Sequence, residues 1–410
     1  MTKPGRTGQA ASWWDDPELA RDRLRRHVQI ITESRSEVAV ATGGSDDLAD
    51  MDHMYREGAI LVRDADLPRV RDIVGGEVQA SLINGVTLLR PEVGTEEALS
   101  QIDAQLGVGV ATPDHVVHVT GKSGACPATE PEDVDQPPFP GVNSDPAMDG
   151  SGVSVAVVDT GFLPAVAQQH AWLAGVTGDK EDFKAPQIQP FAGHGTFVAG
   201  IVRCLAPRAE IRVEGFLRHG GTIFESEIVT QLDEALDRVP DVICLAAGTT
   251  TRRNLNLLGF EALWQHRLRH YKGTVLVAAA GNDGNRGPFW PAAFPWAVSV
   301  GALDPHDNRA RFTNYGSWVD VYTLGVDIVN AFPKGTYTYQ EGRRKGRKRE
   351  FKHGMARWSG TSFATPIVAG MIAARMSATG ESGRQAADAL LETARRGARP
   401  RVGAILKPPA

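Results

Sequence analysis

The feature that most constrains the fold is an almost continuous β-branched stretch at residues 153–158, which ends at Asp159. A strand that is apolar on both faces must be covered on both faces, as strands of parallel sheets are. Further apolar stretches lie at residues 241–245, 274–280, 297–300 and 319–322, with helical patterns at 225–238 and 255–271. This alternation predicts an α/β fold: a doubly wound, mostly parallel sheet with helices on both faces and sites at the carboxyl ends of its strands.

Length and composition limit the possible functions. The 410 residues can form two or three domains, and the net charge of -5 gives no general affinity for nucleic acid or membranes. No apolar stretch is long enough to span a bilayer, and the first residues lack the apolar core of a secretion signal. Three cysteines, a low and odd number, are typical of a reducing compartment. We therefore expect a cytoplasmic protein with no nucleic-acid or membrane partner and no cofactor.

The chain divides into five segments. They are an N-terminal extension with one helix (1–54), a small unit (55–121), a Pro-rich linker (122–150), a large domain (151–398) and a C-terminal tail (399–410). In the small unit, strands are expected near 59–62, 78–82, 86–89 and 115–119, and helices near 67–73 and 95–106. Asn84 and Gly85 predict a hairpin, and residues 95–97 approximate a capping box. The order β-α-β-β-α-β is ferredoxin-like, and it says nothing about function by itself.

A serine near the C-terminus has the setting of a nucleophile. Ser362 lies in the polar stretch 359–366, directly before the apolar residues 367–374. Pro366 is tolerated only in the first turn of a helix, which predicts a helix that starts near Ser362. The positive end of the helix dipole would favour negative charge on that hydroxyl. Taken alone, however, Ser362 is more typical of a simple N-cap, and a serine nucleophile also requires a general base.

Three other polar residues complete a candidate set. Asp159 closes a buried strand, His194 stands between two glycines, and Asn282 follows the strand at 274–280. Each has an ordinary structural alternative, as a turn cap, a buried histidine or a turn residue. Their joint appearance with Ser362, each in its own motif, favours a catalytic arrangement instead.

On these motifs the chain resembles the subtilisin-like serine peptidases. The matching stretches are 157–161, 194–196, 280–282, 360–362 and 364–366, within a resemblance that covers about residues 151–376. The order Asp, His, Ser is also the subtilisin order. The resemblance implies that Ser362 attacks the scissile carbonyl, that His194 takes its proton and that Asp159 orients His194. It also implies an oxyanion hole formed by Asn282 and the backbone N–H of Ser362.

The same resemblance implies a substrate-binding region and an internal inhibitor. Two short stretches would pair with an extended peptide or protein substrate and wall its S1 pocket; they are Leu245, Ala246, Ala247 and Gly248 on one side and Ala279, Ala280 and Gly281 on the other. The small unit resembles the inhibitory prodomain of the family, with self-cleavage expected near Thr120 and Gly121. An alternative is a silent or permanently inhibited binding or scaffold protein on a peptidase fold.

Two features depart from the family or lie outside its motifs. Many members carry a calcium-binding insertion after the histidine helix, but residues 202–207 continue without one, so activity is expected to survive chelation. A basic segment contains Arg343, Arg344, Lys345, Arg347, Lys348 and Arg349. It is either a solvated hairpin tip or a clamp on the leaving-group side of the cleft that favours acidic partners.

Overall fold

The structure is a computed structural model that describes residues 16–119, 128–218 and 220–408. Its centre is a seven-stranded sheet in which every neighbouring pair is parallel. Across the sheet the strands are β15 (Val321–Leu324), β14 (Ala297–Leu303), β13 (Val275–Ala279), β12 (Val242–Leu245), β7 (Ser154–Asp159), β10 (Glu210–Gly215) and β8 (Thr177–Gly178). The predicted α/β class is therefore confirmed.

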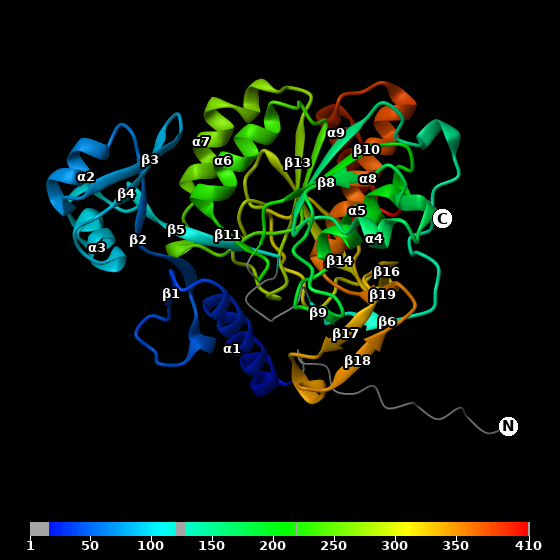
Figure 1. Cartoon of the computed structure of the whole chain (residues 1–410). Helices are drawn as coiled ribbons and strands as arrows, with labels where there is room; N and C mark the ends of the chain where they lie inside the picture. Colours follow the sequence, from blue (N-terminus) through cyan, green and yellow to red (C-terminus); the bar gives the residue numbers. More distant parts are fainter. Residues whose placement is uncertain (1–15, 120–127, 219, 409–410) are drawn as a thin grey trace.

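Helices cover both faces of this sheet (Figure 1). One side carries α5 (His194–Leu205), α8 (Thr361–Thr379) and α9 (Gly383–Arg396), and the other carries α6 (Glu225–Leu236) and α7 (Leu258–His266). Side chains of β7 pack on both faces of the sheet. Val155 and Val157 belong to the core with α5 and α8, whereas Val158 belongs to the core with α6 and α7. Burial on both faces explains why β7 is apolar almost throughout.

The small unit has the β-α-β-β-α-β order expected from its sequence. Its elements are β2 (His53–Arg63), α2 (Leu67–Val74), β3 (Glu77–Ile83), β4 (Val86–Arg90), α3 (Thr95–Leu106) and β5 (Ala111–His118). The predicted capping box at residues 95–97 is wrong: Gly94 is the N-cap and makes no side-chain cap. The Thr95 hydroxyl instead accepts the backbone N–H of Gly58, at 2.8 Å, because β2 passes beside the start of α3.

The N-terminal extension is attached to the small unit. Helix α1 (Pro17–Ser34) is capped by Asp16, and β1 (Val38–Ala41) pairs antiparallel with β2. Val28 and Ile31 of α1 form a small apolar core with Val116 of β5 and Phe224. Phe224 ends β11 (Thr222–Phe224), which follows β10 in the large domain but pairs antiparallel with β5. One sheet thus joins the small unit to the large domain (Figure 1).

The described part of the Pro-rich linker, residues 128–150, packs on the large domain. Within it, β6 (Glu132–Asp133) pairs with β19 (Met355–Trp358), which also pairs with β16 (Ile328–Ala331). A hairpin of β17 (Gly335–Thr338) and β18 (Lys348–Phe351) lies next to them, with β9 (Gln187–Ile188) on its edge. In the tail, Ile405 bridges to Tyr322. The shorter helices are α4 (Pro164–Ala167) and 3₁₀ turns at Leu48–Asp50, Pro146–Met148, Ala171–Leu173, Arg252–Asn254, Leu268–His270 and Gly342–Arg344.

None of the helices in the described part of the chain is both long enough and apolar enough to cross a membrane.

Candidate active site

Asp159 and His194 meet at the carboxyl end of the central sheet. Asp159 is the last residue of β7, and His194 is the first residue of α5. The Asp159 Oδ1 atom lies 2.7 Å from His194 Nδ1, and both side chains are fully buried. Because a carboxylate accepts, this bond assigns the ring proton to Nδ1 and leaves Nε2 as the basic nitrogen. The predicted pairing of these two residues is therefore present in the structure.

Ser362 lies beside this pair but is not bonded to it. It is the second residue of α8, whose N-cap is Gly360, and the ring of the next residue, Phe363, is 5.3 Å from the His194 ring. The Ser362 hydroxyl is 3.2 Å from the carbonyl oxygens of Val119 and Ala246. His194 Nε2 is buried and has no hydrogen-bond partner among the residues that the structure describes. The chain thus brings the three groups together without a Ser–His hydrogen bond.

Asn282 is tied to the residue before Ser362. Its Oδ1 atom accepts the backbone N–H of Thr361 at 2.9 Å and the Thr361 hydroxyl at 3.0 Å. The same hydroxyl accepts the N–H of Gly281 at 3.2 Å. The oxygen end of the amide is therefore held by Thr361, and the donor end of the Asn282 side chain is its amino group.

The predicted edge 245–248 contacts a strand of this same chain. Leu245 ends β12, and beyond it Gly248 exchanges two backbone hydrogen bonds with His118, both at 3.0 Å. On the other side, the N–H of Val119 donates to the carbonyl of Gly221 at 3.1 Å. The end of the small unit is therefore held as an extended strand between 246–248 and the Gly221–β11 edge, with its last described carbonyl at Ser362. The expected cleavage point, Thr120–Gly121, lies outside the described residues.

The other predicted wall of the S1 pocket, at residues 279–281, is buried. Ala279 ends β13, the N–H of Ala280 donates to Val300, and Gly281 leads directly into Asn282. All three predicted wall residues of this stretch, Ala279, Ala280 and Gly281, are buried. They lie beside Thr361 and Asn282. Their role in binding a substrate stays a prediction.

Sequence reasoning missed two parts of this site. One is the Gly221–β11 edge, for which the Gly220–Gly221 pair before an apolar triplet was a usable signal. The other is Glu181, a buried carboxyl group that accepts the N–H of Gly193 at 3.0 Å. Burial, with a smaller contribution from the charge of Asp159, raises the pKa of Glu181 well above its usual value. A glutamate in a polar loop carries no sequence signal for such a position.

The segment after α5 does not fit a calcium site. Helix α5 ends at Leu205 and β10 begins at Glu210, so only residues 206–209 connect them. These residues are Ala206, Pro207, Arg208 and Ala209, and none has the carboxylate or amide oxygen that calcium prefers. Within the described ranges, no group of three or more His, Cys, Asp or Glu side chains is arranged to hold a metal ion.

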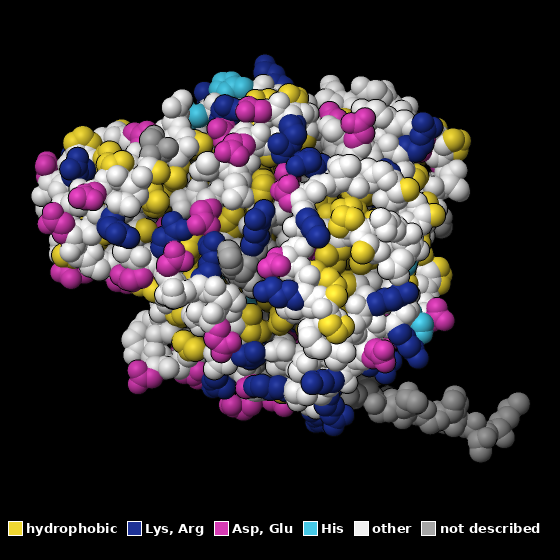
Figure 2. Space-filling view, viewed as in Figure 1, with side chains coloured by type: hydrophobic (Ala, Val, Ile, Leu, Met, Phe, Trp, Pro, Cys, Tyr) yellow, Lys and Arg dark blue, Asp and Glu magenta, His cyan; other side chains and the backbone are white. Residues whose placement is uncertain are grey.

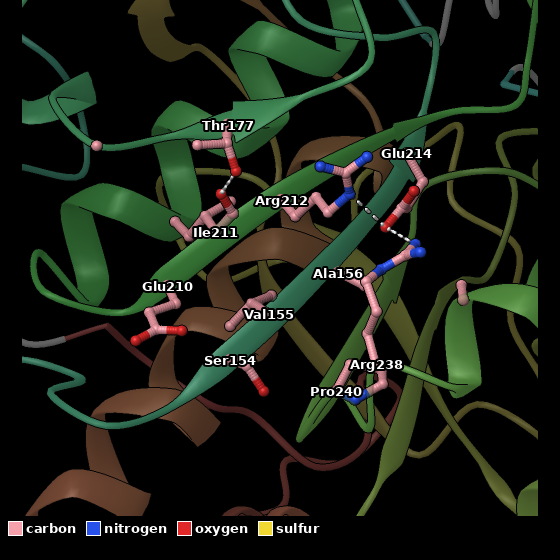
Figure 3. Close-up of a pocket in the computed structure, with 12 residues that line it drawn as sticks. Ser154, Val155, Ala156, Thr177, Glu210, Ile211, Arg212, Glu214, Arg238 and Pro240 are labelled. Carbon is pink, nitrogen blue, oxygen red and sulfur yellow. Dashed lines mark hydrogen bonds and ion pairs between the residues drawn. The ribbon is translucent and has the colours of Figure 1, made fainter.

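A separate cavity of about 410 Å³ lies at the opposite, amino-terminal end of β7 and β10 (Figure 3). Ser154, Val155, Glu210 and Ile211 line it, and Arg238 reaches across to Glu214. Glu214 is paired with both Arg212 and Arg238, so its charge is compensated inside the protein. This cavity holds none of the four candidate catalytic residues.

Comparison with known proteins identifies the family of this chain. The profile of the subtilase family, peptidase S8, matches residues 150–405. The chain therefore belongs to the subtilase family of serine peptidases, as its motifs predicted.

Individual relatives support the same family assignment. A thermophilic serine proteinase of Bacillus sp. (strain AK1) is 34% identical over 260 residues, which cover 60% of this chain and 57% of that protein. Thermitase of Thermoactinomyces vulgaris is 33% identical over 258 residues, or 60% and 82% of the two chains. The match thus spans little more than half the length of the Bacillus proteinase.

Two solved structures share the fold. A cold adapted subtilisin-like serine proteinase aligns with a TM-score of 0.50 and 22% identity, over 67% of this chain and 97% of its own. Fervidolysin from Fervidobacterium pennivorans aligns with a TM-score of 0.57 and 20% identity, over 86% and 60%.

Proposed function

We propose that the protein is a serine endopeptidase that hydrolyses peptide bonds through an acyl-enzyme. The single observation that carries this proposal is the buried Asp159–His194 hydrogen bond of 2.7 Å beside the first turn of α8, which bears Ser362. His194 Nε2 takes the proton of Ser362 as its oxygen attacks the scissile carbonyl, and Asp159 stabilises the imidazolium that forms. The imidazolium then protonates the leaving amine, and water hydrolyses the acyl-enzyme by the same route.

The oxyanion of each tetrahedral intermediate needs donors that are already in place. We assign this role to the Asn282 amino group and the backbone N–H of Ser362 at the start of α8. The hydrogen bonds from Thr361 to Asn282 Oδ1 support the assignment, because they hold the amide in one orientation before substrate arrives. A loss of one such donor costs about 2.7–4 kcal/mol in subtilisin, a member of this family.

Substrates bind, in this proposal, as the chain's own residues 117–119 do. Backbone hydrogen bonds to Gly221 and Gly248 place an extended strand along the cleft. Such bonds are independent of side chains, so they give affinity with little sequence preference. Preference then comes from the side-chain subsites, including the one that Val119 fills next to Gly221 and Phe191.

The small unit acts in this proposal as an intramolecular inhibitor. The carbonyl of Val119 takes the place at Ser362 that a substrate carbonyl would need, and the β5–β11 pairing holds it there. Buried polar contacts anchor the strand further. The Asp114 carboxylate accepts the N–H of Ser226 at 2.9 Å and its hydroxyl at 2.7 Å, and His115 contacts Glu225 at 3.3 Å. Release of this strand frees the Ser362 hydroxyl to turn toward His194 Nε2.

In this proposal the basic segment also helps to hold the N-terminal part of the chain against the large domain. Figure 2 shows Lys and Arg side chains along the lower edge of the molecule, where Figure 1 places the β17–β18 hairpin. Lys345 lies 3.4 Å from Asp22 of α1, and Arg344 lies 2.7 Å from Glu132. We propose that the segment is a clamp for acidic residues, and that its partners in the intact chain are the N-terminal extension and the linker.

An inactive scaffold is the second candidate, favoured by one observation: the cleft is filled and the Ser–His bond is not formed. A fluorophosphonate probe separates the two. Labelling of the intact chain means an active enzyme, labelling only after removal of the residues before Gly121 means a gated enzyme, and no labelling in either form means a scaffold. Ser362→Ala is the control. Mass spectrometry of a fragment that starts near Gly121, absent in this variant, would support self-cleavage, whereas an intact active chain would exclude it.

A further inference from the structure

The peptide groups on both sides of His194 are held by side chains from other loops. Before it, the N–H of Gly193 donates to both oxygens of the Glu181 carboxyl group, at 3.0 Å each. After it, the N–H of Gly195 donates to the Thr160 hydroxyl at 3.1 Å. A contact with the Thr160 side chain lowers the pKa of Glu181, against the larger effect of burial. Two side chains that contact each other therefore fix the backbone on either side of the histidine.

The start of α5 depends on such outside help. The first N–H groups of a helix lack partners within it, and a Ser, Thr, Asp or Asn cap normally supplies one. Here the N-cap is Gly193, in the left-handed region at φ +80°. A Cβ atom at Gly193 would lie 2.6 Å from Cδ of Pro333, so a residue with a capping side chain does not fit. Glu181, which follows β8 in sequence, takes over part of the capping role.

The surroundings of Glu181 favour its neutral form. It is 8% exposed, and the negative charges of Asp159 on β7 and of the neighbouring Asp182 act on it. Burial, and after it the charge of Asp159, raise its pKa well above the usual range. Glu181 also lines a cavity of about 490 Å³ together with Lys184 and Arg218, and this cavity extends to Gly221 beside Val119. A neutral carboxyl group supplies hydrogen bonds and shape at this position, and an amide of the same length reproduces both.

We propose that Glu181 is a positioning residue for the peptidase reaction: by binding the amide of Gly193 it fixes the first turn of α5 and so keeps the His194 ring aligned between Asp159 and Ser362. The inference rests on the proposed function. Displacement of a catalytic group by about 1 Å lowers a rate by about a hundredfold. Loss of the hydrogen bond from Gly193 to Glu181 should therefore lower kcat, while the binding of substrate along Gly221 and Gly248 is unchanged.

Three variants test the role of Glu181, each assayed as the full chain and again after removal of the residues before Gly121. Glu181→Gln keeps the length and an acceptor, Glu181→Asp keeps a carboxyl group but is one methylene shorter, and Glu181→Ala removes the anchor. Asp182→Asn is the matched control, since this neighbour is exposed. We expect kcat for a chromogenic peptide to fall by about tenfold to a hundredfold in the Ala and Asp variants, with KM within about twofold. The Gln and control variants should keep kcat within about threefold, and the acidic limb of the kcat/KM profile should not move.

A second measurement does not require activity. The proton that His194 Nδ1 donates to Asp159 should give a far-downfield NMR resonance in the folded chain. It should persist in Glu181→Gln and shift or broaden in Glu181→Ala and Glu181→Asp, while thermal unfolding shows that each variant is folded. If wild type shows the resonance but hydrolyses the peptide neither as the intact chain nor after removal of the residues before Gly121, the proposed function fails and the resonance still tests Glu181. Equal losses in the Gln and Ala variants, or an Ala variant with normal kcat and resonance, would overturn the positioning role.

Discussion

Arg23 in the N-terminal helix and Glu341 in the β17–β18 hairpin form an ion pair of 2.5 Å whose two side chains are almost completely buried. Arg23 also donates to the carbonyl of Ala128 in the linker, at 3.2 Å. One guanidinium group therefore connects the extension, the linker and the large domain. Since a buried charge is tolerated only with its partner, this contact couples the docking of α1 to the stability of the whole arrangement.

We expect Arg23→Ala to loosen the N-terminal unit. Removing one partner of a buried pair leaves the other uncompensated and typically costs about 3–5 kcal/mol. Urea unfolding should show this loss, and the rate of probe labelling at Ser362 should rise because the strand at residues 117–119 leaves the cleft more often. The control is Arg25→Ala on the same helix, which breaks a partly exposed pair with Asp47 in the following loop and should change little. Unchanged labelling in a destabilised Arg23 variant would contradict the coupling of α1 to the cleft.

Glu130 should make this region sensitive to pH. Burial, and then the nearby Glu341 carboxylate, raise the pKa of Glu130 to about 7, although it accepts the N–H of Gln340 and the hydroxyl of Tyr337. The folded form thus binds a proton more tightly than the unfolded chain, where an ordinary glutamate titrates near 4.5. The free energy of unfolding should therefore fall as pH rises from about 4.5 to 7, by at most about 3 kcal/mol.

Denaturation at pH 5 and pH 8 measures this effect. Glu130→Gln should flatten the dependence, because the amide keeps the shape of the side chain and does not titrate. Glu132→Gln, at a half-exposed residue paired with Arg344, should leave the dependence as it is in wild type. The same pH slope in wild type and in Glu130→Gln would show that another group is responsible.

Much of the large domain was predictable because its signals are local. A buried parallel strand such as β7 is apolar over its whole length, so its position and its terminal Asp159 are visible in the sequence. The start of α8 at Thr361 lies within one residue of the expected position, but Pro366 is the sixth residue of the helix and not part of its first turn, as the sequence had suggested. In the small unit, alternation and the Asn84–Gly85 turn identified the β3–β4 hairpin.

What the sequence did not reveal depends on contacts between distant segments. Ser362 and Val119 are 243 positions apart in the sequence. No local pattern predicts that the carbonyl of Val119 will accept the hydroxyl of Ser362. The same holds for Glu181, whose carboxyl group accepts the backbone N–H of Gly193, twelve residues away. The failed capping box at Thr95 has this cause too, since the N–H of Gly58 competes for the hydroxyl that the box would use.

Chelation should leave the enzyme active. Residues 206–209, which connect α5 to β10, offer no side-chain oxygen to calcium. We expect peptide hydrolysis and the thermal unfolding temperature to be the same with excess EDTA and with added calcium. A loss of activity in EDTA that calcium restores would show that a site elsewhere in the chain supports the fold.

Gly221 should control the subsite that Val119 fills. Its φ is +72°, and a Cβ atom there would lie 2.8 Å from Cγ2 of Val119 and 3.1 Å from Cγ of Phe191. Gly221→Ala should therefore push against any β-branched side chain in this position, as well as straining the backbone. We expect kcat/KM to fall more for a peptide with Val there than for the same peptide with Gly, and inhibition by the small unit to weaken.

Gly346→Ala is the matched control for this prediction. Gly346 has a similar φ, +77°, but a Cβ atom there would meet nothing within 4 Å. The variant carries the same backbone strain in the β17–β18 hairpin, so it should leave the ratio of the two peptides unchanged. If Gly221→Ala lowers both peptides equally, the effect comes from strain in the strand edge and not from contact with the side chain, and Val119 does not define a selective subsite.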